Sequence, residues 1–279
     1  MVINVKNSEI IKNLELDNYK LNSFQKDLDE LNISLTENQL RQFIQYYELL
    51  VEWNQVMNLT AITEFDDVLK KHFIDSLSLV KACDLSGEQN DNSTEISLID
   101  IGTGAGFPGI PLKIAFPYIK VTLMDSLNKR VDFLNEVIAV LGLDGIETIH
   151  GRAEDYAKPD LLREKYDLCV SRAVANLSTL SEYCLPYVKV GGKFISYKSE
   201  KIIDEIKDAE YAIDILGGKV EEQVSFMLPN SELYRNLFVV TKCADTPLKY
   251  PRKAGMASKK PLTRHEVILR RQKTLPKYN

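Results

Sequence analysis

The sequence has few cysteines and histidines and no long hydrophobic run. Its 279 residues include four cysteines and three histidines. The cysteines lie far apart, without a CxxC pair or a histidine nearby (Cys83, Cys169, Cys184 and Cys243). This spacing argues against a zinc site and against a disulfide scaffold, and it is typical of a reducing compartment. We therefore expect a cytoplasmic protein that binds no metal ion and packs its cysteines as small buried hydrophobic residues.

Membrane-spanning and secretory segments are also lacking. No apolar run approaches the roughly 20 residues that cross a bilayer. The N-terminal sequence MVINVKNSEI lacks the basic and apolar regions of a signal peptide. The hydrophobic content of 44% and the charged content of 27% are ordinary for a soluble globular protein. We expect no membrane partner, and nothing in the composition demands more than a monomer.

Charge is distributed unevenly along the chain. The formal net charge is −5, but residues 248–279 carry ten Lys or Arg and a single acidic residue, Glu266. A basic tail on an acidic body is expected of a protein that contacts a polyanion with one end. A solvated tail without a partner is the alternative, and charge alone leaves both open.

Helical periodicity dominates the first 95 residues. Apolar residues recur at helical spacing after Thr36, a residue type that begins helices, and residues 63–83 repeat the pattern. Asn58 is interpreted as a helix-end cap. His72 is interpreted as part of the wall between helices and sheet, with simple helix packing as the alternative. We predict an N-terminal extension over 1–22 and a helical subdomain over 23–95 that ends in a polar linker over 86–95.

After residue 95, short apolar runs alternate with helical stretches. The runs predict seven strands, at 96–101, 121–125, 146–150, 166–173, 192–198, 219–226 and 236–242. This alternation predicts an α/β fold with a parallel, doubly wound sheet. The last two strands are too close in sequence for a crossover helix, so we expect them to be antiparallel. We predict one domain over 96–245 and a basic C-terminal tail over 246–279.

Four glycines follow the first predicted strand, in LIDIGTGAGFPGIPL. Gly104, Gly106 and Gly109 fit the GxGxxG pattern, and Asp125 ends the next predicted strand. A tight strand-to-helix turn explains such glycines in any α/β protein, so the pattern alone is weak. Each glycine costs roughly 0.5–1 kcal/mol relative to alanine inside regular structure. Four together therefore indicate that a ligand approaches the backbone closely.

Acidic residues at the strand ends distinguish between two nucleotide cofactors. Asp100 would repel the pyrophosphate of a dinucleotide, whereas S-adenosylmethionine offers an ammonium and a sulfonium group. Asp125 can accept hydrogen bonds from both ribose hydroxyls of either cofactor. Ala153 and Glu154 follow the third predicted strand, where an adenine would lie, and Arg172 follows the fourth. This set of strand ends favours S-adenosylmethionine.

The sequence resembles the bacterial glucose-inhibited division protein B (GidB) family. The resemblance rests on WNQVMNLTAI, KHFIDSL, LIDIGTGAGFPGIPL, LMDSLNKRVDFL, SRAVANL and KYPRKAGMASKKPL, in the family's order and spacing over residues 33–262. It implies a Rossmann-like class I S-adenosylmethionine methyltransferase that acts on 16S ribosomal RNA or the 30S subunit. The acceptor that it implies is N7 of a guanine, at position 527 of the 530 loop.

The resemblance also implies cofactor contacts. They fall on Gly102 and Phe107 in the glycine loop, on Ala153 and Glu154, and on Arg172. To these we add Asp100, Gly104 and Asp125 from the chemistry of the strand ends.

Arg172 is also the predicted catalytic residue, because a guanidinium at this strand end can hold guanine O6 or a phosphate. A structural ion pair with Asp100 or Glu154 is the alternative. If N7 is the acceptor, it carries a free lone pair, so we expect no general base.

Seven basic residues are candidates for RNA contacts. Those in the C-terminal stretch would supply salt-sensitive affinity for phosphates. The other two lie near predicted strand ends, where a solvated cation is the alternative. The seven are Lys198, Arg235, Lys249, Arg252, Lys253, Lys259 and Lys260.

Two other functions remain open from the sequence. An NAD-dependent oxidoreductase is supported by the GxGxxG spacing alone. A non-catalytic RNA-binding assembly factor would have little reason to keep an intact glycine loop and Asp125. The basic tail disfavours a methyltransferase of small molecules.

Overall fold

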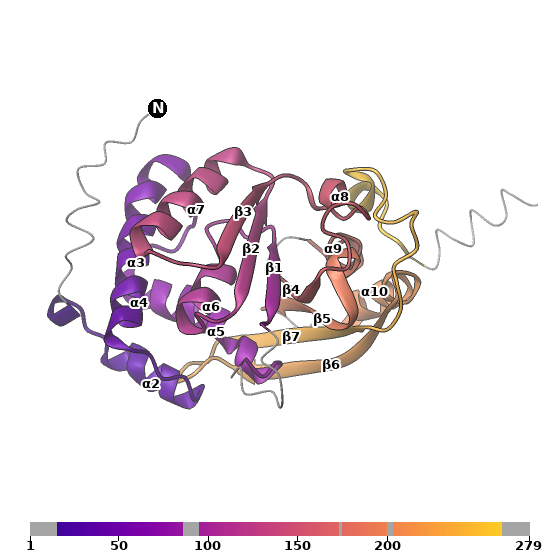
Figure 1. The fold of residues 1–279 in the computed structure, drawn as a ribbon. Coiled ribbons are helices and arrows are strands. Elements are labelled where there is room, and N and C mark those ends of the chain that lie inside the picture. The colour runs from indigo at the N-terminus through magenta and orange to yellow at the C-terminus, as the bar shows by residue number, and fades with distance from the viewer. Residues whose placement is uncertain (1–15, 86–94, 173–174, 200–202, 264–279) are drawn as a thin grey trace, which may run out of the picture. The chain divides into compact units, whose positions relative to one another are not determined.

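The computed structural model of the chain describes residues 16–85, 95–172, 175–199 and 203–263 (Figure 1). The chain divides into two compact units, Met1–Gly151 with Ser225–Arg235 and Arg152–Val224 with Asn236–Asn279. The predicted boundary between residues 95 and 96 falls inside the first unit. Residues 1–15 of the predicted extension, 86–94 of the predicted linker and 264–279 of the predicted tail lie outside the described residues.

The first unit contains the N-terminal helices, three strands and the helices that connect them. Within the described residues its helices are α2 (Asn22–Glu30), α3 (Glu37–Met57), α4 (Phe65–Val68), α5 (Asp75–Leu77), α6 (Gly109–Ala115) and α7 (Asn128–Leu141). Short 3-10 turns occur at Leu16–Asn18 and Ser78–Lys81, and a π-helical turn occurs at Leu69–Ile74. The strands are β1 (Ser97–Ile101), β2 (Lys120–Asp125) and β3 (Ile146–His150). Helix α3 packs on α6 and α7, so the N-terminal helices and the first strands form one body.

The second unit contains the later strands and their helices. Within the described residues its helices are α8 (Ala153–Tyr156), α9 (Leu177–Cys184), α10 (Ile203–Ile215) and α11 (Met256–Lys259), with a 3-10 turn at Leu185–Tyr187. Its strands are β4 (Tyr166–Arg172), β5 (Val188–Lys198) and most of β6 (Gly218–Met227) and β7 (Tyr234–Lys242).

Seven strands form one mixed sheet, in the order β3-β2-β1-β4-β5-β7-β6. The pairs β1–β2, β2–β3 and β4–β5 are parallel, whereas β7 runs antiparallel to β5. The predicted α/β class, the doubly wound sheet of about seven strands and the antiparallel final hairpin are confirmed. Strand β5 begins four residues earlier than predicted, because Val188 already pairs with Tyr166 ahead of a register shift.

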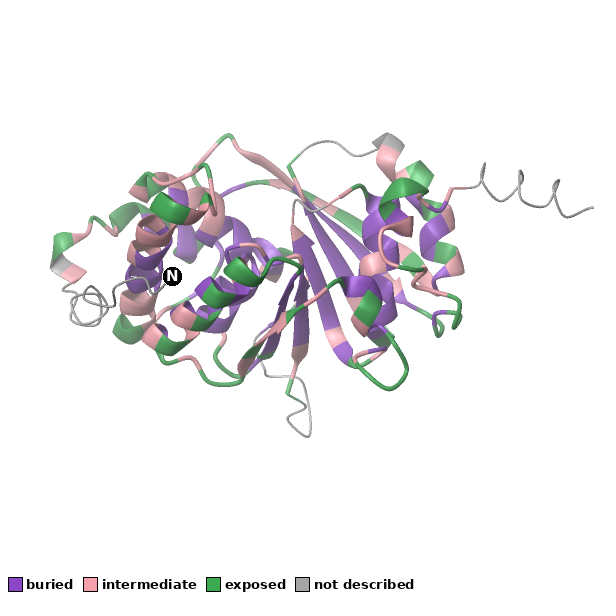
Figure 2. Cartoon of the chain, turned by 90° about the horizontal axis from the view of Figure 1, so that it is seen from above, coloured by how far each residue is buried: buried purple, intermediate pink, exposed green. Residues whose placement is uncertain are grey.

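The strands supply the apolar core of each unit. Ile99 and Leu123 are fully buried in the first unit, and Val170 and Ile195 are fully buried in the second. Figure 2 shows burial along the strands and exposure on the outer faces of the helices. Continuous burial of this kind is expected where helices cover both faces of a parallel sheet.

Helix α3 has the start and the end that the sequence predicts. The Thr36 hydroxyl accepts a hydrogen bond from the Gln39 backbone N–H, and the Gln39 side chain accepts one from the Thr36 N–H. This is a capping box, which satisfies N–H groups that a helix start leaves unpaired. The helix ends at Asn58, whose φ of 50° confirms it as the helix-end cap.

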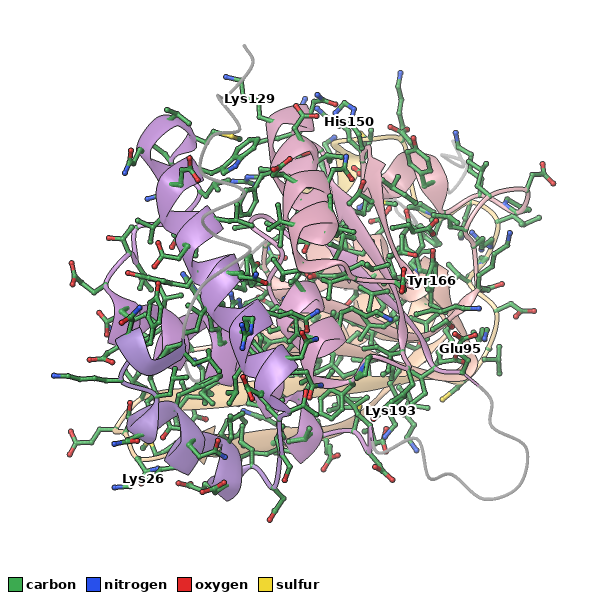
Figure 3. All side chains as sticks on the ribbon, turned by 60° about the vertical axis from the view of Figure 1, so that its left-hand side comes forward. Lys26, Glu95, Lys129, His150, Tyr166 and Lys193 are labelled. Carbon is green, nitrogen blue, oxygen red and sulfur yellow. The ribbon has the colours of Figure 1, made fainter. Side chains whose placement is uncertain are left out.

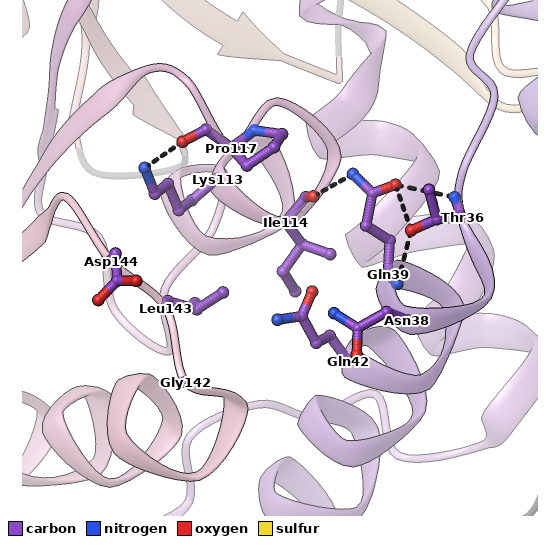
Figure 4. A pocket seen from close by; sticks show the side chains of 10 residues that line it. All are labelled: Thr36, Asn38, Gln39, Gln42, Lys113, Ile114, Pro117, Gly142, Leu143 and Asp144. Atoms are coloured by element: carbon purple, nitrogen blue, oxygen red, sulfur yellow. Dashed lines mark hydrogen bonds between the residues drawn. The ribbon is translucent and has the colours of Figure 1, made fainter.

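Two glutamines of α3 cap the ends of two other helices. Gln39 Nε2 donates to the Ile114 carbonyl oxygen in α6 at 2.7 Å, and Gln42 Nε2 donates to the Leu141 carbonyl oxygen in α7 at 2.9 Å. These carbonyls belong to the last turns of their helices, where carbonyl groups have no hydrogen-bond donor within the helix. The glutamines line a cavity of about 430 Å³ next to both helix ends (Figure 4).

The stretch predicted as helical over 63–83 is helical but not uniform. It changes from α4 through the π-helical turn to α5 and a 3-10 turn. Lys70, in the π-helical turn, pairs with Asp27 and donates to the Pro229 carbonyl oxygen at 2.6 Å. The local distortion thus coincides with contacts to distant segments, which apolar periodicity does not reveal.

All four cysteines are free thiols. Cys169 and Cys184 are buried, but Cys83 is half-buried and Cys243 is exposed. The expectation of four buried cysteines is therefore wrong for Cys243. In the part of the chain that the structure describes, no helix has the length and apolar character needed to cross a membrane.

We predict that Lys113→Met lowers the free energy of unfolding by about 1–3 kcal/mol. Lys113 is 3% exposed, and its Nζ donates to the carbonyl oxygens of Pro117 (2.7 Å) and Ile119 (2.6 Å) between α6 and β2. Burial lowers the pKa of Lys113, but both carbonyls lose their donor when it is removed. Urea denaturation measures the effect. The control is Lys120→Met, whose exposed ion pair with Glu95 contributes at most about 1 kcal/mol; equal losses in the two variants would contradict the prediction.

Candidate functional site

The loop between β1 and α6 has a backbone that requires glycine. Gly102, Gly104 and Gly106 have φ values of 71°, 63° and 97°. Side chains disfavour this left-handed region, so the three glycines let the chain turn tightly at the end of β1. The loop therefore has a conformational reason for three of its four glycines.

The space around each glycine is a second reason for the lack of a side chain, and this space differs between the glycines. A Cβ atom on Gly106 would overlap the side chains of Ile110 and Tyr46, and one on Gly109 would overlap Leu123. These two positions lack side chains because the protein itself packs there. A Cβ on Gly104 would have no neighbour within 4 Å. The sequence interpretation that all four glycines admit a ligand is thus too broad, and open space of this kind is found at Gly104.

Asp100 holds the loop from inside. Its side chain is fully buried, and Oδ2 accepts hydrogen bonds from Thr103 Oγ1 (2.7 Å) and from the Gly109 backbone N–H (2.9 Å). The structure therefore gives Asp100 a role in shaping the loop. Its predicted direct contact with a cofactor stays a prediction.

Asp125 holds the other side of the loop. Its carboxylate is 3% exposed and accepts hydrogen bonds from the backbone N–H groups of Gly104 (3.0 Å, Oδ2) and Leu127 (2.9 Å, Oδ1). Arg130 Nη1 also lies 3.2 Å from Oδ2. A carboxylate offers about four acceptor positions, so only one remains for a ligand. Accepting two ribose hydroxyls therefore requires Arg130, whose side chain is 37% exposed, to leave Oδ2.

Lys129 and His150 lie at this end of the first unit, near Arg130. Figure 3 shows Lys129, in the first turn of α7, and His150, the last residue of β3, at the same end. His150 Nε2 lies 3.2 Å from the Ser126 carbonyl oxygen. Sequence reasoning did not single out Lys129 or Arg130, although both follow Asp125 closely in the LMDSLNKRVDFL stretch.

Phe107 belongs to a buried aromatic cluster. Its ring stacks on His72 with centroids 4.5 Å apart and planes within 18°, and it also contacts Tyr46. His72 Nε2 lies 2.8 Å from Thr60 Oγ1, which joins the KHFIDSL stretch to the MNLT stretch. The Tyr46 hydroxyl donates to the Ala105 carbonyl oxygen inside the glycine loop. The N-terminal helices thus hold the loop directly, and a cofactor contact by Phe107 stays a prediction.

In the second unit, Ala153 and Glu154 begin helix α8. They are 7% and 8% exposed. The Tyr187 hydroxyl donates to the Ala153 carbonyl oxygen at 2.6 Å. Burial of this hydroxyl raises its pKa. Glu154 Oε1 accepts a hydrogen bond from the Gly255 backbone N–H at 2.8 Å. Both residues are therefore oriented by the protein, and their predicted contact with an adenine stays a prediction.

Arg172 and Lys198 end neighbouring parallel strands, β4 and β5. Arg172 is half-buried, and its predicted catalytic and cofactor roles stay predictions. Lys198 Nζ donates to Glu205 at 2.7 Å and to the Ala175 carbonyl oxygen at 3.1 Å. A carboxylate thus already pairs with this cation, and the predicted contact of Lys198 with RNA phosphate stays a prediction.

Two arginines predicted to bind RNA are also paired internally. Arg235 Nε donates to the buried Asp75 carboxylate at 2.7 Å. Arg252 donates two parallel hydrogen bonds to Glu182, from Nε to Oε1 at 2.9 Å and from Nη2 to Oε2 at 2.6 Å. The Glu182 side chain is only 1% exposed. The structure gives both arginines structural roles, because removing either side chain would take a guanidinium away from a buried carboxylate.

The remaining predicted RNA contacts are exposed. Residues 249–262, which we call the C-terminal segment, carry four solvent-exposed lysines: Lys249, Lys253, Lys259 and Lys260. The segment is folded rather than a free tail. Arg163 donates to the Tyr250 carbonyl oxygen at 2.7 Å, and Ser178 donates to the Leu262 carbonyl oxygen at 2.8 Å.

The described part of the chain contains no cluster of potential metal ligands. Among residues 16–85, 95–172, 175–199 and 203–263, no group of three or more His, Cys, Asp or Glu side chains is placed to hold a metal ion.

Comparison with known proteins identifies close relatives. Residues 39–234 match the GidB family, described as rRNA small subunit methyltransferase G. The chain is 53% identical over 242 residues to the ribosomal RNA small subunit methyltransferase G of Lachnoclostridium phytofermentans, covering 87% of this chain and 97% of that protein. It is 54% identical over 232 residues to the protein of the same name from Alkaliphilus oremlandii, covering 83% and 94%.

Similarity to solved structures is weaker. The chain is similar to M. jannaschii TYW2 in complex with AdoMet, with 16% identity and a TM-score of 0.42, over 56% of this chain and 70% of that one.

We predict that Tyr46→Phe lowers the free energy of unfolding by about 1–2 kcal/mol. The change keeps the fully buried ring and its stacking but leaves the Ala105 carbonyl in the glycine loop without this donor. Tyr47→Phe is the matched control, because its hydroxyl is only part-buried and donates to the Thr63 carbonyl oxygen at 3.3 Å. Urea denaturation of both variants should show a clearly larger loss for Tyr46→Phe; a loss no larger than that of the control would contradict this account of the loop.

Proposed function

The chain belongs to the GidB family, rRNA small subunit methyltransferase G, and from this premise we propose that it transfers a methyl group from S-adenosylmethionine to N7 of a guanine in 16S ribosomal RNA. The observation that carries the proposal is the match over most of the chain to proteins of that name. The guanine at position 527 of the 530 loop is part of the proposal and rests on family resemblance.

The glycine loop fits the proposed cofactor. The Gly104 backbone faces open space, and the neighbouring Asp125 carboxylate keeps one acceptor position after its bonds to Gly104, Leu127 and Arg130. In the first unit, Gly102, Gly104, Phe107 and Asp125 would hold the cofactor. When bound, S-adenosylmethionine supplies a methyl group on a positively charged sulfur. The roles of Ala153, Glu154 and Arg172 remain part of the proposal.

The proposed reaction requires the protein to position the two reactants and requires no proton transfer to or from the protein. N7 of guanine carries a lone pair and no proton, so attack on a methyl carbon needs no general base. The chain's contribution is then to hold the reacting atoms about 3–3.5 Å apart and to exclude water. Arg172 is our candidate for orienting the acceptor through guanine O6 or a phosphate.

The C-terminal segment is our candidate for contact with the RNA backbone. Its four exposed lysines lie within 12 residues of sequence, and lysine–phosphate contacts supply affinity without sequence specificity. We propose that the protein works in the cytoplasm as a monomer, on 16S rRNA or the 30S subunit. Neither the oxidoreductase nor the non-catalytic alternative is favoured by a specific observation.

The first test is methyl transfer from labelled S-adenosylmethionine to 30S subunits that lack this modification. We expect incorporation at one guanine N7, lost in Arg172→Ala. Asp125→Asn should weaken cofactor binding at least about tenfold, because it removes a charged hydrogen-bond acceptor beside Gly104. Calorimetry with the cofactor measures the binding. Cofactor binding without label in RNA would overturn the proposed substrate, and absence of cofactor binding would overturn the proposed function.

We predict that exposed and paired cations respond differently to salt. Lys253→Gln with Lys259→Gln should weaken RNA binding and lower the slope of log K against log salt by about one to two, because each phosphate contact releases counterions. The free energy of unfolding should stay within about 0.5 kcal/mol of wild type, since both side chains are exposed.

Arg252→Gln is the contrasting variant. It should lower the free energy of unfolding by about 3–5 kcal/mol, because the buried Glu182 carboxylate loses the guanidinium charge that pairs with it. Fluorescence titration of RNA at several salt concentrations, with denaturation of each variant, separates the two effects. An unchanged salt slope in the double lysine variant would remove the C-terminal segment as an RNA contact.

A further inference from the structure

The C-terminal segment is anchored to α9 by more than its arginine. The Arg252 guanidinium pairs with Glu182 of α9, and the Arg252 backbone N–H also donates to Glu182 Oε1 at 2.8 Å. Thr179 Oγ1 of α9 donates to the Ala257 carbonyl oxygen at 3.2 Å, and the Ala257 side chain is buried. These contacts fix the path of residues 252–257 across the second unit.

The segment turns sharply where it meets Glu154. Gly255 has a φ of 79°, and its backbone N–H donates to Glu154 Oε1 at 2.8 Å. A Cβ atom on Gly255 would have no neighbour within 4 Å. The glycine is therefore needed for the left-handed backbone and not for space, and this backbone is what aims the N–H at the carboxylate.

The Glu154 carboxylate is held in a buried setting. Glu154 is 8% exposed, and Tyr183, whose pKa is raised first by burial and then by the charge of Glu154, lies in α9 beside it. Tyr183 also shares a hydrogen bond with Ser258 of the segment. Glu154 is thus oriented by the segment, although the two are 101 residues apart in sequence.

We propose that the C-terminal segment is a positioning element of the cofactor site, and that Gly255 sets the orientation in which Glu154 receives S-adenosylmethionine. The inference rests on the proposed function, since it takes Glu154 as a cofactor contact. It gives the segment two roles, because the exposed lysines face RNA while the backbone at Gly255 holds Glu154.

The test measures cofactor affinity without RNA. Gly255→Ala strains the left-handed turn without a steric clash, so it displaces the N–H from Glu154 and removes no charge. Gly191→Ala is the matched control, because Gly191 lies in the same unit with a φ of 88° and also has no neighbour within 4 Å of its Cβ position. Calorimetry with S-adenosylhomocysteine on the full chain gives the dissociation constants, and thermal unfolding gives the stabilities.

We expect Gly255→Ala to weaken S-adenosylhomocysteine binding at least about fivefold, while Gly191→Ala loses similar thermal stability and keeps wild-type affinity. Wild-type affinity in Gly255→Ala would overturn the inference and leave the proposed function intact. Failure of the wild-type chain to bind S-adenosylhomocysteine or S-adenosylmethionine would overturn both.

A second variant covers the case in which Gly255→Ala does not fold. Ser178→Ala with Thr179→Val removes two hydroxyl groups that anchor the segment to α9, without changing charge or Glu154. The same loss of cofactor affinity is expected in this variant. Lys259→Gln with Lys260→Gln, which removes charge and keeps every anchor, should bind cofactor like the wild type and RNA more weakly. Cofactor affinity that falls with the lysines and not with the anchors would overturn the inference.

Discussion

The buried carboxylate of Asp100 is the constraint on which the glycine loop depends. A charged group that is removed from water needs hydrogen-bond donors, and Asp100 finds them in Thr103 and in the backbone of Gly109. Thr103 lies in the loop and Gly109 is the first residue of α6, so the chain must fold back over the end of β1 as α6 begins. The close approach is possible because Gly109 carries no side chain that would overlap Leu123.

Contacts with other elements also fix the conformation of the loop. Asp125 of β2 binds the Gly104 N–H, and Tyr46 of α3 binds the Ala105 carbonyl. The loop is therefore held by its own strand, by the next strand and by an N-terminal helix, while the Gly104 backbone stays open. A site fixed on several sides before a ligand arrives loses little conformational entropy when the ligand binds. This is the physical sense in which the N-terminal helices contribute to the proposed cofactor site.

Features that depend on local sequence were predictable, and features that depend on distant partners were not. Thr36 and Asn58 mark the ends of α3 because capping depends on the nearest residues, and the strands follow from short apolar runs. Arg252 and Arg235 find their carboxylates 70 and 160 residues away. The sequence shows that a residue is a cation but not which counter-ion it meets, so paired and exposed cations looked alike. The link between Glu154 and Gly255 was missed for the same reason, since no local pattern joins them.

The cations of the C-terminal segment differ in the substitutions that they tolerate, because Arg252 pairs with the buried Glu182 and the lysines are exposed. Lysine and arginine both attract phosphate, so exchange between them at Lys253 or Lys259 keeps the charge that faces solvent. At Arg252 the same exchange is not conservative, because an ammonium group cannot reproduce the two parallel bonds to a buried carboxylate. We therefore expect related sequences to exchange lysine and arginine at the exposed positions and to keep the pair of Arg252 and Glu182 together.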